Sequence, residues 1–176
     1  MTALADALAR FRRWPSPPEG STSNPFKLVS TLDGPAGANE VEDAWYGHGL
    51  PSDALDLWVA CREARLFEDV EYGQWGLALL APSASATRTA QERAARPADL
   101  RPDDIVLGEF LGEQELLVVA PSETGRRRIL IALPLDSRAD WLGVAQDLGE
   151  FLERYFAHAG DKYWERPDVG AEPEER

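Results

Sequence analysis

Apolar side chains recur at the i, i+3, i+4, i+7 spacing of a helix in three stretches of this sequence. The positions are Leu4, Leu8 and Phe11 in the first; Ala54, Leu57, Trp58 and Cys61 in the second; and Trp141, Val144, Ala145, Leu148, Phe151, Leu152, Tyr155 and Phe156 in the third. The pattern predicts a short amphipathic helix over residues 3–13, a helix that opens at Leu50-Pro51, and a closing helix that Gly160 ends. Each apolar stripe is expected to face the core.

Two further helices are indicated by their end signals. Asn39 stands as an N-cap before three acids, which the helix dipole favours in a first turn, so a helix is expected over Asn39–Tyr46. Another is expected between Leu80 and Ile105, where "PSASATRTAQERAARP" has one proline at its start and a second at its stop.

Short apolar or alternating runs, bounded by glycine, proline or acidic residues, predict five strands. They are Ala64–Phe67, Trp75–Leu80, Ile105–Phe110, Glu115–Ala120 and Arg128–Leu133. The run "FKLVST" at residues 26–31 is compatible with an edge strand, and its pattern alone does not decide the matter. Turn-like links, one of them containing Gly112, favour antiparallel pairing. We therefore expect an α+β fold: a single domain with a mostly antiparallel sheet of about four to six strands flanked by helices.

The two ends of the chain differ in composition from its middle. "WPSPPEGSTSNP" concentrates proline, serine and glycine, so residues 1–36 are expected to form a helix and an arm that is either a linker or wrapped on the domain. The α+β domain is expected over residues 37–164. Residues 165–176 lack apolar periodicity and are expected to form a disordered acidic tail.

Charge restricts the class of partner. The 176 residues contain 31 acids and 18 bases, a formal net charge of -13, which disfavours nucleic acids and anionic membranes and favours a basic partner. An acid excess that only keeps a small protein soluble is the alternative. Cys61 is the single cysteine, no apolar stretch has membrane-spanning length, and the N-terminus lacks the order of a secretory signal. We therefore expect a cytoplasmic protein without disulfides.

Catalytic and metal-binding patterns are weak. His48 lies in the glycine-flanked "YGHGLP", and His158 lies near a helix C-terminus, where the dipole accounts for it. Neither histidine lies beside a serine or cysteine in the sequence pattern of a catalytic nucleophile. We therefore expect that the protein is not an enzyme and that it binds no cofactor and no metal. A metal-dependent hydrolase that uses Glu68, Asp69 and Glu71 is a remote alternative, because adjacent residues of an extended strand point to opposite faces.

The stretch "FEDVEYGQWG" is the main candidate for binding a protein. Carboxylates steer a basic partner, and aromatic side chains supply contact area. The expected partner-binding residues are Trp45, Tyr46, Glu68, Asp69, Glu71, Tyr72, Gln74, Glu109 and Glu113. The last two belong to the set if their strand pairs with the neighbouring one. The structural alternative is that Trp75 begins a core strand while Gly73 and Gly76 serve backbone geometry.

The order of several motifs resembles the SUKH superfamily, the Smi/Knr cell-wall-regulator-like domains. The motifs are "GLPSDALDLW", "ARLFEDVEYGQWGLALL", "DDIVLGEFLGEQELLVVA" and "IALPLDSRADWLGVAQDLGEFLERYF". The segment "CREARLFED" stands where the family usually has an "NGG"-like sequence. "EYGQWGL", "GEFLGEQELLV", "PLDSRADW" and "GDKYWE" are similar to an actinobacterial subgroup.

This resemblance implies a non-enzymatic α+β domain that binds proteins. Bacterial members are similar to immunity proteins, which neutralise polymorphic toxins, often nucleases, by direct binding. The implied partner is therefore a basic toxin domain. Yeast relatives look like adaptors in cell-wall signalling, which implies the alternative of a regulatory or scaffolding module with an unrelated cellular partner. A monomer and a homodimer both stay open.

Overall fold

The computed structural model describes residues 3–14, 27–121 and 127–165, with only the backbone of Arg127. Seven strands form one antiparallel sheet whose spatial order is the chain order. They are β1 (Leu28–Leu32), β2 (Ala64–Asp69), β3 (Leu77–Leu79), β4 (Ile105–Phe110), β5 (Leu116–Pro121), β6 (Arg127–Ala132) and β7 (Leu142–Ala145). The helices are α1 (Ala3–Arg12), α2 (Ala38–Ala44), α3 (Ser52–Ala60), α4 (Pro82–Ala95) and α5 (Leu148–Ala157), with 3-10 turns η1 (Arg138–Asp140) and η2 (Tyr163–Glu165). The expected α+β single domain is confirmed for the described residues.

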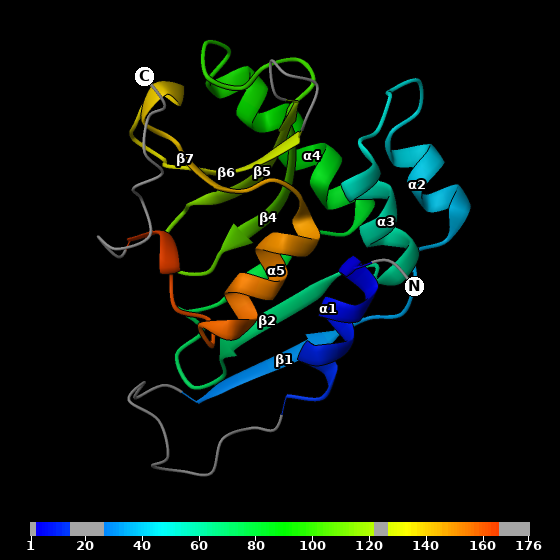
Figure 1. Ribbon diagram of the computed structural model, residues 1–176. Coiled ribbons are helices and arrows are strands. Elements are labelled where there is room, and N and C mark those ends of the chain that lie inside the picture. Colours follow the sequence, from blue (N-terminus) through cyan, green and yellow to red (C-terminus); the bar gives the residue numbers. More distant parts are fainter. Residues whose placement is uncertain (1–2, 15–26, 122–126, 166–176) are drawn as a thin grey trace, which may run out of the picture.

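The main core lies on the sheet face that α1 and α5 cover, and these two helices lie side by side (Figure 1). Its largest fully buried side chains are Leu8, Phe11, Leu57, Trp58, Leu66, Phe67, Leu77, Leu79, Leu107, Phe151, Tyr155 and Tyr163. The main core also contains every apolar position that the helical pattern predicted for the first helix and for α3. Burying such stripes is what holds short helices in place, because helices of this length are marginal on their own.

The opposite face of the sheet carries a smaller apolar cluster. Trp141 closes it, with the guanidinium groups of Arg96 and Arg138 at 5.2 and 5.4 Å from its ring. Arg138 also forms an ion pair with Asp104, which is fully buried, and its backbone N–H donates to Asp99 Oδ1 at 3.0 Å. These contacts hold together the connection that precedes β4 and the connection that follows β6, and they place both over this face of the sheet.

Helix α4 covers the part of β4 that the short strand β3 leaves without a strand neighbour. The N–H of Val106 donates to Thr89 Oγ1 at 3.0 Å, and the carbonyl of Val106 accepts from Ser85 Oγ at 2.6 Å. Both α4 residues are buried. The two hydroxyls therefore satisfy backbone groups that another strand would otherwise have to pair.

Strand β2 contains a bulge at Phe67. Val29 of β1 lies opposite Glu68, and Thr31 lies opposite Arg65. Two residues of β1 are therefore matched by three residues of β2. Phe67 has φ 51°, and its N–H donates to Ser30 Oγ at 3.0 Å. An extra residue breaks the alternation of faces. Leu66 and Phe67 are consequently both buried, and Arg65 pairs with Glu68 at 2.8 Å.

The closing helix is shorter than the sequence predicted. It begins at Leu148, after Asp147, whose carboxylate caps the helix. The prediction that residues 141–145 form its first turns is wrong, because Trp141 ends η1 and Leu142–Ala145 form the edge strand β7. Their apolar side chains fit a strand because Trp141 packs into the smaller cluster and Val144 packs into the main core on the other face.

The C-terminus of α5 has the hydrogen bonds of a Schellman motif. Ala159 N–H donates to the Phe156 carbonyl at 3.0 Å, and Gly160 N–H donates to the Tyr155 carbonyl at 3.2 Å. Ala159 and Gly160 have φ values of 51° and 84°. A Cβ on Gly160 would lie 2.7 Å from the Cβ of Phe67, so the sheet can approach this closely only because a glycine follows the helix.

The structure also bears on the expected edge strand, on the start of α2 and on the two ends of the chain. The run at residues 26–31 does contain an edge strand, β1. Asn39, the expected N-cap of α2, lies within its first turn, and Gly37 takes the N-cap position without a side-chain cap. Among the described residues, none of the helices has the length and apolar character needed to cross a membrane. Residues 15–25 of the Pro/Ser/Gly-rich stretch and residues 166–176 of the expected acidic tail lie outside the described residues. Glu165, the first residue of that expected tail, belongs to η2.

Candidate functional site

The β2–β3 loop and the β4–β5 turn meet at one end of the sheet. The backbone of Gly112 approaches Gln74 so closely that a Cβ on Gly112 would lie 2.5 Å from the Gln74 carbonyl oxygen. The N–H of Leu111 donates to the Gly76 carbonyl at 2.9 Å. The segment after α5 joins them, because Lys162 from that segment lines a small cleft together with residues of both.

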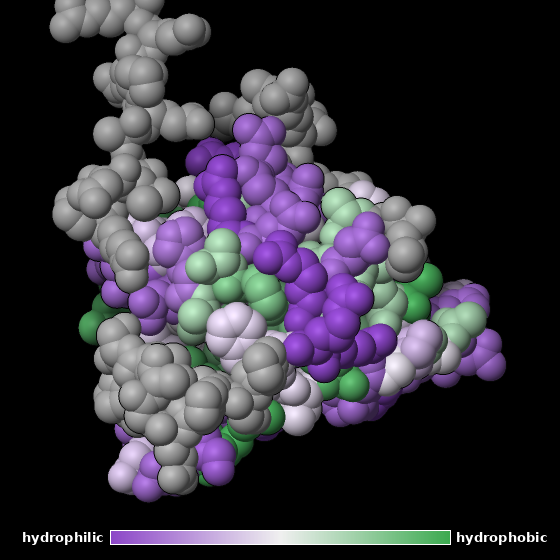
Figure 2. All heavy atoms as spheres, turned by 60° about the horizontal axis from the view of Figure 1, so that its bottom comes forward, coloured by the Kyte–Doolittle hydropathy of each residue, from purple (hydrophilic) through white to green (hydrophobic). Residues whose placement is uncertain are grey.

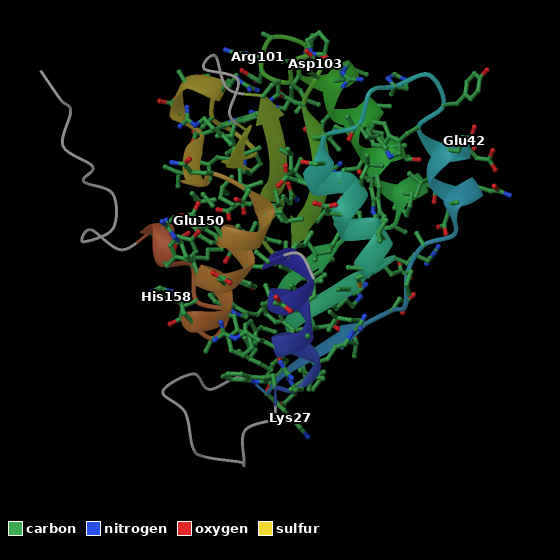
Figure 3. The ribbon with its side chains drawn as sticks, turned by 45° about the vertical axis from the view of Figure 1, so that its right-hand side comes forward. Lys27, Glu42, Arg101, Asp103, Glu150 and His158 are labelled. Carbon is green, nitrogen blue, oxygen red and sulfur yellow. The ribbon has the colours of Figure 1, made fainter. Side chains whose placement is uncertain are left out.

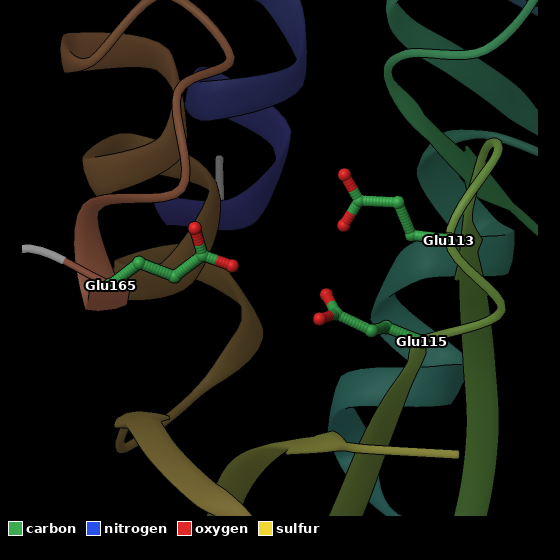
Figure 4. A group of neighbouring side chains, drawn as sticks. All are labelled: Glu113, Glu115 and Glu165. Carbon is green, nitrogen blue, oxygen red and sulfur yellow. The ribbon is translucent and has the colours of Figure 1, made fainter. Parts of the chain in front are cut away.

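Lys162 is the centre of an ion-pair cluster between the β4–β5 turn and the segment after α5. Its ammonium lies 2.7 Å from Glu115 Oε2 and 3.6 Å from Glu165 Oε1, and it also contacts Glu113. Figure 4 shows Glu113 and Glu115 pointing from one side toward Glu165 on the other. The ring of Phe110 lies 5.6 Å from the ammonium. One buried cation thus holds three carboxylates together and fastens η2 to the sheet.

Burial shifts the protonation of this cluster. Burial, with the nearby Glu165 carboxylate adding to it, raises the pKa of Glu115 from 4.5 to about 7. Burial also lowers the pKa of Lys162, against the effect of Glu165. The Lys162 contact opposes the rise at Glu115, but one ammonium does not neutralise three carboxylates within 4.8 Å of one another. The cluster therefore takes up a proton close to neutral pH.

The three carboxylates of the cluster also have the spacing of a metal site, since their oxygens lie within 4.8 Å of one another. Carboxylate oxygens suit hard cations such as magnesium and calcium. In this protein the ammonium of Lys162 contacts all three glutamates and takes the place of such a cation. The three carboxylates are therefore arranged around the ammonium of Lys162.

Asp69 organises the β2–β3 loop. It is 1% exposed, its Oδ1 accepts from the N–H of Glu71 at 3.0 Å, and its carbonyl accepts from the N–H of Gly73 at 2.8 Å. This is the geometry by which aspartate stabilises a turn. The remote alternative of a metal site would need the carboxylates of Glu68, Asp69 and Glu71 to come together. Glu68 instead pairs with Arg65, and Asp69 is occupied with the turn.

Six polar side chains belong to the strand end, the loop and the turns that meet here, and we call them the acidic face. They are Glu68, Glu71, Tyr72 and Gln74 of β2 and the β2–β3 loop, Glu113 of the β4–β5 turn, and Glu165 of η2. Tyr72 is 66% exposed, and the side chains of Glu113 and Glu165 are 41% and 58% exposed. Figure 2, which brings the lower end of Figure 1 forward, shows hydrophilic side chains between apolar patches.

Three residues of the expected binding set lie away from the acidic face. Trp45 is 7% exposed and packs on Trp58 in the core, with 6.3 Å between ring centroids. Tyr46 is exposed, but it follows α2, at the other end of the molecule (Figure 1). Glu109 pairs with Arg88 of α4 at 2.8 Å, on the far side of β4 from the Lys162 cluster. The expected set is thus divided by the fold.

The remaining reactive side chains have structural contacts. His48 is exposed, and its ring lies 5.9 Å from that of Trp45. His158 Nδ1 lies 2.8 Å from the Arg154 carbonyl oxygen, as expected near a helix C-terminus. Cys61 is buried and free, its thiol donates to the Glu63 carbonyl at 3.0 Å, and burial raises its pKa.

Three members of the ion-pair cluster, Glu115, Lys162 and Glu165, are candidates that sequence reasoning missed. Lys162 lies 47 residues from Glu115, so no local pattern joins them. One compositional signal was present: of the 18 basic residues only Lys27 and Lys162 are lysine. The compact ammonium of a lysine suits a buried position among three carboxylates better than the larger, planar guanidinium of an arginine.

The cleft beside Lys162 has a volume of about 10 Å³, room for about one water molecule, which is far less than the ~300–1,000 Å³ of ordinary ligand pockets. Aromatic side chains and Lys162 line it. Neither the protein-family models nor the curated proteins include a match to this chain. The fold, the Lys162 cluster and the acidic face are therefore the observations from which a function can be inferred.

Proposed function

We propose that this protein is a non-enzymatic, SUKH-type binding domain whose acidic face binds a basic protein, and that it acts in the cytoplasm as an immunity protein that covers a nuclease-type toxin. The observation that carries the proposal is the convergence of three separate chain segments into one face with exposed carboxylates and an exposed tyrosine. Loops that a rigid scaffold brings together in this way commonly carry binding function.

The charge of the face suits a basic partner. It contains four glutamates, and among the described residues the cations that contact them are Arg65 and Lys162. The carboxylate of Glu71 has no ion pair with any described residue, so its charge is fully available to a partner. A carboxylate surface steers basic proteins in solution and competes for the groove in which a nuclease holds phosphates.

The face is held in shape before any partner binds. Gly76 has φ 115°, and a Cβ there would lie 2.8 Å from the Cα of Glu68, so the loop rests directly on β2. Asp69 fixes the intervening turn, and Lys162 fixes the opposite side of the face. Preorganisation of this kind reduces the entropy lost on binding.

The experiment that tests the proposal is affinity capture from the native host with the immobilised full-length protein. Wild type is compared with a Glu68→Lys/Glu71→Lys variant, and with an Asp103→Lys/Asp136→Lys variant that makes the same charge change elsewhere. Asp103 and Asp136 are exposed and lie in the connections before β4 and after β6. Figure 3 shows Asp103 at the end of the molecule opposite Lys27. We expect a basic protein to be retained by wild type and by the second variant, and to be lost from the first.

The identity of the retained protein separates the two functional classes. A basic toxin domain supports the immunity role, whereas a basic cellular protein with no toxin activity supports the regulatory or scaffolding alternative. Equal retention by all three forms, or retention of no basic protein, contradicts the proposed surface.

A further inference from the structure

Helix α2 contributes no buried residue to the fold. Its seven residues, Ala38–Ala44, are all half-buried or exposed, and the N-cap Gly37 supplies no side-chain cap. A helix of this length gains little from backbone hydrogen bonds alone and depends on packing for its stability. Val41 and Ala44 supply that packing from the edge of the core, which leaves Glu42 and Asp43 exposed on the rest of the helix.

The chain around α2 and α3 carries uncompensated negative charge. No lysine or arginine occurs between Lys27 and Arg62, whereas six acids do: Asp33, Glu40, Glu42, Asp43, Asp53 and Asp56. Arg62 pairs with Glu40 and Asp33, and the buried Asp53 accepts from the N–H of Leu148 at 2.9 Å. The other three are exposed and form no ion pair with a described residue. Figure 3 shows one of them, Glu42, at the outer edge of the molecule.

Large apolar side chains are exposed in the same stretch. Tyr46 is 82% exposed, Val59 is 74% exposed and Leu55 is 42% exposed. Leu55 and Val59 stand four residues apart and so share one face of α3. The packing of Trp45 on Trp58 of α3 joins the end of α2 to α3. Asp56 stands next to this apolar strip on α3, and the exposed Glu42 and Asp43 belong to α2, which the Trp45–Trp58 contact joins to α3.

We infer that the outer surface of α2 and α3 is a second docking site, which takes a basic amphipathic helix of a partner protein. Apolar residues of such a helix at i, i+3 and i+4 match the Leu55–Val59 spacing, and its lysines or arginines meet Glu42, Asp43 and Asp56. A second copy of this chain is disfavoured as the occupant because it would present the same acids. The site lies apart from the acidic face, so it does not depend on the function proposed above.

The test uses the full-length, isotopically labelled protein and a synthetic amphipathic leucine/lysine helix as the probe. Amide chemical shifts locate binding, and titration gives its strength. We expect the shifts to concentrate in residues 38–60, and Leu55→Ser/Val59→Ser to weaken binding by roughly tenfold or more. Both replaced residues are exposed, so the variant keeps its core. Glu68→Lys/Glu71→Lys serves as the control and should bind the probe as wild type does.

Two further probes decide whether binding is more than attraction to an acidic protein. A peptide of the same composition but scrambled order keeps the charge and loses the apolar stripe, and a leucine/glutamate helix keeps the stripe and reverses the charge. Both should bind at least roughly tenfold more weakly than the leucine/lysine helix. Equal binding of either peptide, or shifts that spread over the acidic face, would overturn the inference.

Discussion

Replacement of Glu115 by glutamine should change how the stability of the protein depends on pH. The folded protein holds a proton on Glu115 up to about pH 7, whereas the unfolded chain releases it near pH 4.5. Between these values the native state binds more protons than the unfolded state, so the free energy of unfolding falls as pH rises. Glutamine does not titrate, and it removes this contribution while keeping a polar group beside Lys162.

The magnitude follows from the two pKa values. Integrating proton uptake between 4.5 and about 7 gives a loss of about 2.5 kcal/mol of stability from pH 5 to pH 8. This is an upper value, because the ammonium of Lys162, 2.7 Å from Glu115, favours the ionised carboxylate. A side-chain exposure of 12% means that solvent screens the effect little.

Urea unfolding of wild type and Glu115→Gln at several pH values between 5 and 8 measures this contribution, because all other titrating groups are common to the two proteins. The difference in unfolding free energy should shift steadily in favour of the variant as pH rises. Glu113→Gln is the matched control, since its side chain belongs to the same cluster but is 41% exposed, and its curve should stay closer to wild type. Parallel curves for wild type and Glu115→Gln would refute the reasoning.

Two further stability predictions come from close contacts elsewhere in the fold. Gly160→Ala should cost about 2–3 kcal/mol because its Cβ meets Phe67 at a positive φ, while Gly49→Ala, in open space, should stay within about 0.5 kcal/mol of wild type. Denaturant unfolding compares them, and equal stability would mean that the α5 terminus can move away from β2. Arg138→Met should cost about 3–5 kcal/mol by leaving the buried Asp104 without its ion pair, whereas Arg65→Met should cost less than about 1 kcal/mol; the reverse order in thermal unfolding would contradict this.

Patterns that depend on one segment alone predicted much of the fold. The bounds of β4 are those the sequence predicted, and α3 buries the stripe that its spacing indicated. The strand β7 was missed because Trp141, Val144 and Ala145 suit either a helical stripe or a strand with two covered faces. Only pairing with β6 decides between these structures, and that pairing is a property of the assembled sheet.

The candidate site was predicted only in part, because local patterns reveal its loop residues but not its contacts between distant segments. Glu71, Tyr72 and Gln74 are exposed, as a polar loop between strands would have them. The burial of Asp69 follows from the turn that it stabilises, and the cluster at Lys162 follows from a contact between distant segments. Neither contact leaves a periodic pattern in the sequence.

The central claim is that the acidic face binds a basic protein, and the affinity for the captured partner tests it most directly. Calorimetric titration of the purified partner with wild type and with Glu68→Lys/Glu71→Lys, at low and at moderate salt, provides the measurement. We expect the variant to bind at least roughly tenfold more weakly at low salt, with a smaller loss of affinity as salt rises. Equal dissociation constants for the two proteins at both salt concentrations would contradict the claim.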